Sequence, residues 1–225
     1  MNKRSLFFCF LFAVAASVAA QTNLNISYGV KAGVNFSTIT SGDSELPINP
    51  EYITGFHIGG LANVGIHERF SIQPELLYST QGYFHDYGND IISEGVRTNW
   101  HYLNLPIMGQ YAVTNRLFVE VGPQFGYVVS DKYKFVSGES DIPGGEMMGF
   151  TPQQQEIPAA GGGASEEANG FNRFDVSLIA GAGYFVTPAL SVNARYAHGL
   201  MDTNKNDYIE MKNRVFSVGV SYIFR

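Results

Sequence analysis

The sequence alternates apolar and polar residues with a period of two over eight separate segments. A two-residue period places successive side chains on opposite faces of a strand, so each segment predicts a β-strand with one apolar and one polar face. After position 20, no run of apolar residues is longer than three, which excludes a membrane-spanning helix there. The predicted strands are 27–37, 55–66, 70–81, 101–111, 117–130, 173–186, 190–198 and 213–225.

The connections between these segments alternate between short and long. Three are tight turns, at 67–69, 114–116 and 187–189. The four long links are 38–54, 82–100, 131–172 and 199–212. This rhythm is typical of an all-β fold, an eight-stranded antiparallel up-and-down transmembrane β-barrel with short periplasmic turns and long extracellular loops. Both termini would then lie on the periplasmic side of the outer membrane.

A secreted, soluble β-sandwich would show the same alternation, so the distribution of aromatic residues on the apolar face matters. These residues gather near the strand ends, as in the aromatic girdles of membrane barrels. No Lys, Arg, Asp or Glu stands among the apolar-face residues, which favours lipid as their environment. The predicted girdle at the periplasmic end is Tyr28, Phe70, Tyr111, Tyr184 and Phe224, and the girdle at the outer end is Phe36, Phe56, Tyr78, Tyr127, Phe174, Tyr196 and Phe216.

The polar face of the strands would line the lumen. A barrel of eight strands is narrow enough for its own side chains to fill it. Charged groups removed from water must pair, so we expect a plug of ion pairs and amides. A proton or ion relay is the alternative interpretation of the same residues. The inward charged residues are Lys31, Glu75, Glu120, Asp175 and Arg195.

The first twenty residues have the pattern of a cleaved secretory signal peptide. Lys3 and Arg4 precede the apolar stretch 6–16, and small residues occupy 18–20. Residues 21–225 would then form the barrel domain. The only cysteine, Cys9, lies in the signal, so the mature chain has no disulfide or catalytic thiol. With 14 basic against 20 acidic residues, the composition is also unlike that of a nucleic-acid-binding protein.

Several short stretches resemble the PorT-like outer-membrane β-barrel domain proteins of the Bacteroidota. The most specific are Gln73-Pro-Glu-Leu76 and Leu105-Pro-Ile107, and Ala194-Arg-Tyr-Ala-His-Gly-Leu200 and Val218-Gly-Val-Ser-Tyr222 also match. The resemblance implies an eight-stranded outer-membrane barrel, described for most members only as that or as porin-like. One member serves type IX secretion, but the motifs are shared by many paralogues, so that role is not transferred. The chain ends in Phe224-Arg225, whereas the family's assembly signal usually ends in the aromatic residue.

Two features invite a catalytic or metal-binding interpretation. His85, Asp86 and His101 lie near the predicted outer rim, where a lipid-modifying barrel enzyme would hold its acid and base. No Gly-x-Ser-x-Gly nucleophile motif accompanies them. Residues 202–207 resemble the start of a calcium loop but lack its glycine at the sixth position. We therefore predict no enzyme activity, no catalytic residue, no cofactor and no metal.

The link 131–172 is the longest, and its composition is rich in glycine, proline and glutamine. It holds seven acidic residues and two lysines, and the four long links together hold sixteen acidic and five basic residues. Such a composition predicts a mobile, solvated extracellular loop. A contact surface for cations or for a basic partner is the alternative.

These observations predict a small, non-enzymatic outer-membrane barrel with a plugged lumen and a structural or loop-mediated role in the cell envelope. The alternatives are a narrow porin, a barrel associated with type IX secretion, and a lipid-modifying enzyme. The expected partners are outer-membrane lipid, the barrel-assembly machinery during biogenesis, and an unidentified extracellular or secretion partner. No nucleic acid is expected to bind.

Overall fold

The computed structural model describes residues 25–41, 50–86, 94–137, 156–158, 172–202 and 211–224. Within these ranges the regular structure consists of β-strands. No helix long and apolar enough to cross a membrane occurs among these residues. The strands are β1 (Asn25–Ser41), β2 (Pro50–Glu51), β3 (Ile53–His67), β4 (Phe70–Asp86), β5 (Glu94–Ala112), β6 (Leu117–Ser137), β7 (Glu156–Pro158), β8 (Phe174–Phe185), β9 (Leu190–Gly199) and β10 (Met211–Phe224).

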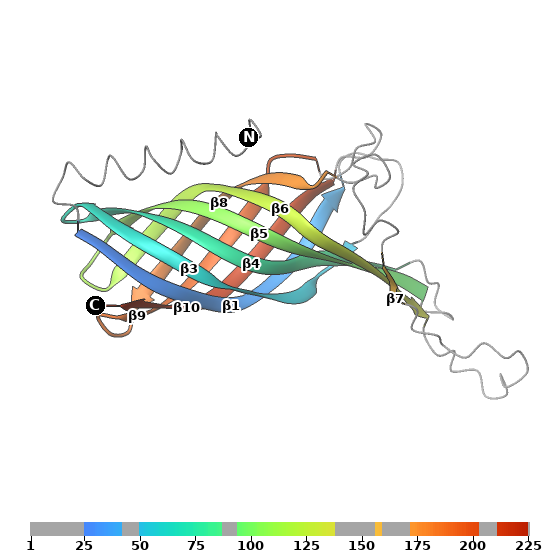
Figure 1. The fold of residues 1–225 in the computed structure, drawn as a ribbon, viewed down its shortest axis with the longest axis horizontal. Helices are drawn as coiled ribbons and strands as arrows, with labels where there is room; N and C mark the ends of the chain where they lie inside the picture. Colours follow the sequence, from blue (N-terminus) through green and yellow to red (C-terminus); the bar gives the residue numbers. More distant parts are fainter. Residues whose placement is uncertain are drawn as a thin grey trace, which may run out of the picture.

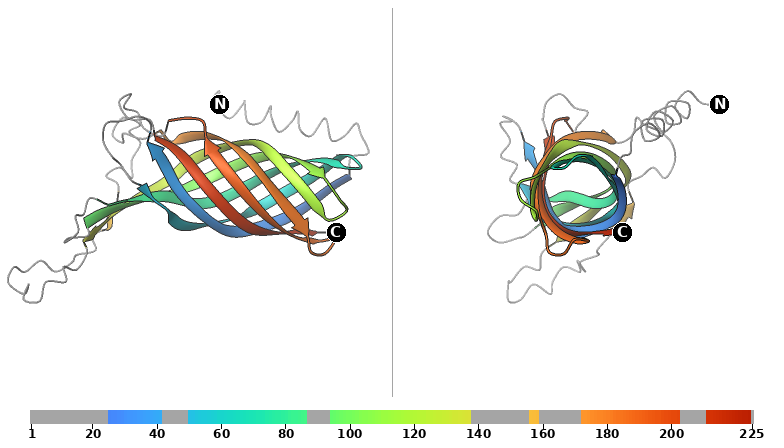
Figure 2. Two further views of the ribbon diagram at one scale, coloured as in Figure 1. Left: turned by 180° about the vertical axis from the view of Figure 1, so that it is seen from behind. Right: turned by 90° about the vertical axis from the view of Figure 1, so that its left-hand side faces the viewer.

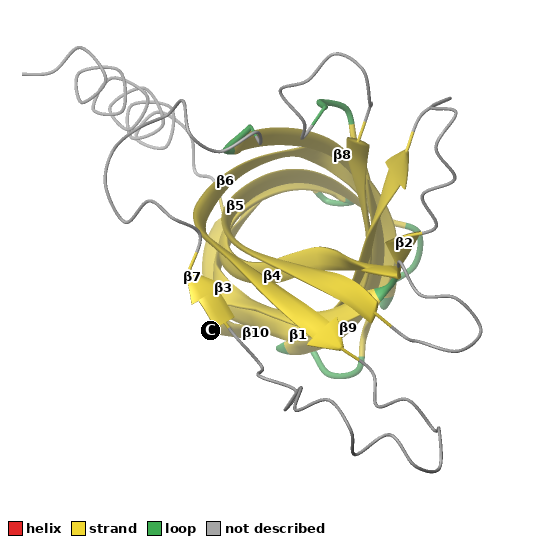
Figure 3. Ribbon diagram, turned by 90° about the vertical axis from the view of Figure 1, so that its right-hand side faces the viewer, coloured by secondary structure: helices red, strands yellow, loops and turns green. Residues whose placement is uncertain are grey.

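Eight of these strands close into a barrel, seen along its axis in Figure 3 and in the right-hand view of Figure 2. The strand order is β4-β3-β1-β10-β9-β8-β6-β5, and pairing of β5 with β4 completes the ring. Every pair is antiparallel, and β1 pairs with β10 from Tyr28↔Phe224 to Ser41↔Met211. The two short strands lie outside the ring, β2 on β4 and β7 on β6. The predicted eight-stranded up-and-down barrel is therefore confirmed.

The three predicted tight turns lie at one end of the barrel, together with the start of β1 and the end of β10. The backbone N–H of Ile223 donates to Ala189 O at 2.8 Å, which ties the end of β10 to the β8–β9 turn. Two of the turns use the same local device. Thr114 Oγ1 accepts the backbone N–H of Leu117 at 2.9 Å, and Thr187 Oγ1 accepts that of Leu190 at 3.0 Å. A threonine at the start of each turn thus satisfies a backbone donor that the reversal leaves unpaired.

The strands at the other end are longer than the alternation predicts. β4 continues to Asp86, β5 begins at Glu94, and β6 runs to Ser137, so the three strands project beyond the ring toward β7 (Figure 1). The prediction that 82–100 and 131–172 are entirely loop was wrong for these segments and for β7. A strand ladder requires only a hydrogen-bonding neighbour, and outside an apolar environment it has no need of alternating side chains. The predicted signal peptide and residues 138–155 and 159–171 of the predicted loop lie outside the described residues.

The distribution of side chains is the reverse of that in a water-soluble protein. Outward-facing Val34, Val121 and Val220 are 42%, 56% and 49% exposed, whereas inward-facing Lys31 and Glu75 are each 2% exposed. A continuous exposed apolar surface of this kind needs an apolar environment around it. The predicted assignment of the apolar face to the outside and the polar face to the lumen is confirmed, and a soluble sandwich does not fit.

Candidate functional site

The middle of the lumen holds a cluster of four charged side chains with Arg195 at its centre. The guanidinium donates from Nε and Nη2 to the two oxygens of Glu120, at 2.6 and 2.8 Å. It also donates from Nη1 and Nη2 to Glu75, at 2.7 and 2.6 Å. Lys31 Nζ lies 3.5 Å from Glu75 Oε1. All four side chains are buried, so two cations balance two carboxylates away from water.

Side-chain amides extend this cluster toward the short-turn end. Gln73 Nε2 donates to Glu75 Oε1 at 2.7 Å, and Gln110 Nε2 donates to Glu120 Oε2 at 3.0 Å. Asn63 Nδ2 in turn lies within 3.1 Å of the carbonyl oxygens of both glutamines. Each carboxylate therefore receives an amide hydrogen bond in addition to those from Arg195, which offsets part of the cost of removing the charges from water.

The strand order makes the Arg195 contacts a cross-brace. Arg195 lies on β9 and Glu75 on β4, and these strands are four apart around the ring in either direction. The pair therefore spans the full width of the lumen. Glu120 on β6 stands two strands from both β9 and β4, so one guanidinium joins three walls of the barrel. Such bidentate, charge-assisted contacts hold both distance and orientation.

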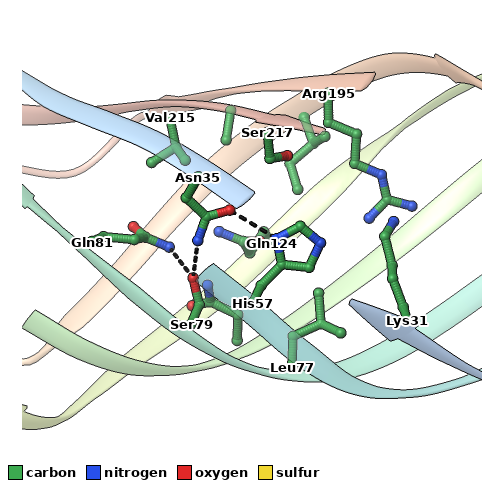
Figure 4. A pocket seen from close by; sticks show the side chains of 13 residues that line it. Lys31, Asn35, His57, Leu77, Ser79, Gln81, Gln124, Arg195, Val215 and Ser217 are labelled. Atoms are coloured by element: carbon green, nitrogen blue, oxygen red, sulfur yellow. Dashed lines mark hydrogen bonds between the residues drawn. The ribbon is translucent and has the colours of Figure 1, made fainter. Parts of the chain in front are cut away.

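A second polar group lies beside the cluster, nearer the loop end (Figure 4). His57 Nδ1 is 2.8 Å from Asn35 Oδ1, and Asn35 Nδ2 donates to Ser79 Oγ at 2.9 Å. Gln81 Nε2 donates to the same hydroxyl at 3.0 Å. Because Asn35 Nδ2 donates to Ser79, the other amide atom, Oδ1, faces His57. His57 Nδ1 therefore carries the imidazole hydrogen, and His57 Nε2 can accept a hydrogen bond.

A small cavity separates these two groups. Its volume is about 30 Å³, and Lys31, His57 and Arg195 are among the residues that line it. Lys31 Nζ and His57 Nε2 are buried and have no hydrogen-bond partner among the described residues. The space is large enough for an ordered water molecule, which could accept from the ammonium and donate to the imidazole. This cavity between the two polar groups thus has room for water but not for a solute.

Glycines make room for the large lumenal side chains. A Cβ on Gly219 would lie 2.9 Å from His57 Nε2, and one on Gly181 would lie 2.9 Å from Arg195 Cγ. The alternation of residues along the strands indicates no lumenal contact for these glycines. It did not single out His57, although the residue falls on the inward face of its predicted strand. Inward glycines on neighbouring strands are the signal that could have indicated a large side chain there.

Asp175 lies apart from the other four predicted lumenal charges. Its Oδ2 accepts from Ser177 Oγ at 3.3 Å and from Asn213 Nδ2 at 3.1 Å, and its Oδ1 has no partner among the described residues. Asn213 Nδ2 also lies 3.0 Å from the Tyr102 hydroxyl oxygen. The five charges therefore do not form one network, because Asp175 belongs to the layer at the loop end.

That layer is largely apolar and closes the loop end of the lumen. The Trp100 ring centroid lies 5.6 Å from that of Tyr83 and 6.4 Å from that of Tyr102, in edge-to-face geometry. At the short-turn end, Phe118 and Phe185 pack with centroids 5.2 Å apart. The expectation of a purely polar filling was therefore wrong at both ends. The buried cluster at the loop end is Ile39, Tyr83, Trp100, Tyr102, Val128 and Met211.

The predicted girdle aromatics lie on the outside of the barrel in two rows. Strand register pairs Tyr28 with Phe224 at the short-turn end and Phe36 with Phe216 at the loop end. All twelve except Tyr78 are exposed, with exposed fractions from 39% for Phe36 to 62% for Tyr28. Tyr78 packs between Phe56 and His101, at centroid distances of 5.9 Å from each.

The candidate catalytic residues do not form a site in the part of the chain that the structure describes. His101 Nδ1 lies 2.5 Å from the Tyr78 hydroxyl, so this histidine belongs to the outer aromatic row. His85 and Asp86 are in β4, but their side chains lie outside the description. Of the predicted calcium-like segment only Asp202 is described, and its Oδ1 accepts the backbone N–H of Met211 at 2.9 Å. No group of three His, Cys, Asp or Glu side chains in the described ranges could hold a metal ion.

Comparison with known proteins shows one family match, to the family described as "Outer membrane protein beta-barrel domain", over residues 19–205. No curated protein matches the chain. Among solved structures, similarity extends to the attachment invasion locus protein Ail of Yersinia pestis, with 14% identity, 88% of this chain and 98% of that chain covered, and a TM-score of 0.45.

Two further solved structures show comparable similarity. Neisserial surface protein A (NspA) has 13% identity, with 89% of this chain and 99% of that chain covered and a TM-score of 0.45. OprG of Pseudomonas aeruginosa has 12% identity, with 91% of this chain and 99% of that chain covered and a TM-score of 0.42.

Proposed function

The chain belongs to the outer membrane protein beta-barrel domain family, and on that basis we propose that it is a non-conducting, non-enzymatic barrel of the outer membrane. Its role is structural or is exerted through the segments at its loop end, by contact with a partner in the envelope or outside the cell. The barrel is the scaffold that holds these segments at the membrane surface, as in other folds that carry function on loops.

The single observation behind this proposal is the layered filling of the lumen. Arg195 bridges Glu75 and Glu120 across the barrel, and aromatic layers lie on both sides of these charges. A conducting pore would need a continuous polar path, whereas the cavity beside the cluster has a volume of only about 30 Å³. A narrow porin function is therefore less well supported than a filled barrel.

Planar-bilayer recording tests the proposal directly. The purified, refolded full chain is expected to give no steady single-channel current above the lipid background. Steady current through the wild-type barrel would overturn the proposal and favour the narrow porin. Glu75→Gln serves as a second measurement, since large and steady conductance in that variant would show that the ionic cluster gates a pore.

We also propose that both termini face the periplasm and the long connections face outward. The start of β1 and the end of β10 share their end of the barrel with three tight turns, and short turns are periplasmic in bacterial barrels. After removal of a 1–20 signal peptide the chain would contain no cysteine. Met201→Cys is therefore expected to react with a membrane-impermeant maleimide on intact cells, whereas Asn115→Cys should react only after lysis. The reverse pattern would invert the orientation.

The finer family assignment is the PorT-like group, supported by the Gln73-Pro-Glu-Leu76 and Leu105-Pro-Ile107 stretches. A role in type IX secretion is one function that this group would permit, with a secretion component as the partner at the loop end. Deletion of the gene, followed by a comparison of the proteins secreted by mutant and parent cells, tests that role. Unchanged secretion would leave a structural role or a role mediated by the segments at the loop end.

A further inference from the structure

The strand pairs of the ring are not all equally complete. Among the described strands, β6–β8, β8–β9, β9–β10, β10–β1 and β1–β3 each keep one continuous register. In β3–β4, β4–β5 and β5–β6, by contrast, two successive residue pairs are missing in the middle of the strands, and pairing then resumes in the same register. The four neighbouring strands β3 to β6 therefore form an interrupted wall, and the rest of the ring is a continuous one.

Each gap in the interrupted wall contains a proline. Proline has no N–H, so the carbonyl group of the residue opposite it loses its ladder donor, and proline is rare inside a sheet for this reason. In lipid, no water can replace the missing donor. The prolines and the residues opposite them are Pro74 and Ala62, Pro106 and Glu75, and Pro123 and Ile107.

The three gaps lie side by side at one depth. Pro74 stands four residues from Phe70 and four from Tyr78, the girdle residues at the two ends of β4. Its register partner on β5 is Ile107, which is also the residue opposite Pro123. The missing hydrogen bonds are thus concentrated near the bilayer midplane, across three adjacent strand pairs.

Arg195 connects the interrupted wall to the continuous one. It lies on β9, and its two carboxylate partners lie on β4 and β6, the strands on either side of β5. One of these partners, Glu75, is the residue opposite Pro106. The guanidinium therefore binds the strands that backbone hydrogen bonds hold least.

We propose that the interrupted wall is a lateral opening of the barrel. β5 separates from β4 and β6 near the midplane while the continuous wall stays paired, and Arg195 holds the interrupted wall closed. Fewer hydrogen bonds must break there than anywhere else at that depth, so local opening requires less free energy. On the lumenal side of the gaps lies Met108, and an opening would connect the lipid with the apolar cluster to which it belongs. That cluster is Met108, Ile179, Ala197 and Val215.

Hydrogen exchange, followed by NMR on the refolded full-length chain in lipid nanodiscs, tests the proposal. The amides of Asn104 and Gly109, the paired residues of β5 beside the gaps, are compared with those of Ala32 and Val220, a register pair of β1 and β10. Asn104 and Gly109 are expected to exchange at least about tenfold faster, the effect of one hydrogen bond missing from the local ladder. Equal rates in the two walls would overturn the proposal.

Pro123→Val supplies the N–H that is missing opposite Ile107. Because the side chain at 123 is exposed on the outer face, the change leaves the lumen intact. It is expected to slow the exchange of Gly109 by about tenfold and to leave the β1–β10 amides unchanged. Leu178→Val is the matched control, since Leu178 is the register partner of Pro123 on β8 and its replacement alters no backbone donor. Unchanged exchange at Gly109 in Pro123→Val, or equal slowing in Leu178→Val, would overturn the proposal.

Arg195→Met tests which residue holds the wall closed. It is expected to accelerate the exchange of Asn104 and Gly109 by about tenfold or more and to change the β1–β10 amides little, because those exchange through fluctuations that leave the interrupted wall closed. Arg195→Lys keeps the charge but lacks the fork that binds both carboxylates, so it gives the same comparison if the methionine variant does not fold. Acceleration by the same factor in both walls would show that Arg195 stabilises the ring as a whole and would reject its assigned role.

Discussion

Arg195 is the residue on which the lumenal cluster depends. It donates four hydrogen bonds to two carboxylates that are otherwise held only by glutamine amides and a lysine. A buried ion pair contributes little net stability compared with apolar packing, but loss of one partner leaves the other charge buried without a counter-ion. Folding is therefore more sensitive to a single substitution in this cluster than the net contribution of the cluster to stability suggests.

Arg195→Met is expected to destabilise the barrel by roughly 3 to 5 kcal/mol, because Glu75 and Glu120 would remain buried without their counter-ion. Urea titration of the protein in lipid vesicles, followed by the gel shift of unheated samples, measures the change. Arg116→Met, which removes an exposed arginine, is the control. An unchanged urea midpoint for Arg195→Met would show that the carboxylates find other partners or become protonated at little cost.

Gly183 is a second position where one side chain matters. A Cβ there would overlap the ring of Phe118, the aromatic residue that closes the short-turn end of the lumen. Gly183→Ala is expected to cost roughly 1 to 3 kcal/mol in the same urea assay, the usual range for overpacking a filled core. At Gly60 the nearest atom would be 3.9 Å from a new Cβ, so Gly60→Ala should have little effect. Equal midpoints for the two variants would contradict the packing of Phe118.

At the level of single strands, two environments succeed one another along the chain. Between the aromatic rows, apolar and polar residues largely alternate, because each strand faces lipid on one side and the filled lumen on the other. Past the outer row, β4, β5 and β6 keep their hydrogen-bonded ladder without this alternation. The hydrogen-bonded ladder depends on backbone groups, whereas the alternation of side chains depends on lipid outside and a filled lumen inside. The ladder therefore extends farther along these strands than the alternation does.

Val220 tests the membrane-facing environment of a strand. It is 49% exposed and lies four residues from Phe216 and four from Phe224 on β10. Val220→Arg is expected to destabilise folding into vesicles by roughly 2 to 4 kcal/mol, the cost of a cation near the bilayer midplane. Asn115→Arg, in a short turn, should cost almost nothing. A soluble protein would tolerate both changes, so equal stability would reject the apolar environment.

For the molecule as a whole, closure between β1 and β10 is the decisive contact. It removes both sheet edges and brings the first and last strands, nearly two hundred residues apart in the chain, into one ladder. Without it, Arg195 on β9 would not face Glu75 on β4 across an enclosed space. The filled lumen is thus a property of the ring and of no single hairpin.

An engineered disulfide checks this closure. Val34 and Val218 are register partners on the outer face, at a separation that suits a cross-link between opposed residues. Val34→Cys with Val218→Cys is expected to oxidise readily and to keep the barrel from opening fully on heating without reductant. The diagonal pair Val34→Cys with Val220→Cys should form the bond poorly. More efficient bonding in the diagonal pair would mean that the strands close in a different register.

The eight strands, the three turns and the two faces could be read from the sequence, because side-chain period and turn chemistry are local properties. Lys31, Glu75, Glu120 and Arg195 could likewise be placed on the inward face. The period does not tell which inward residues meet, since that depends on strand stagger around the closed ring. The separation of Asp175 and the aromatic layers at both ends of the lumen therefore follow from closure, and the contact of His57 with Asn35 follows from the register of the neighbouring strands β1 and β3.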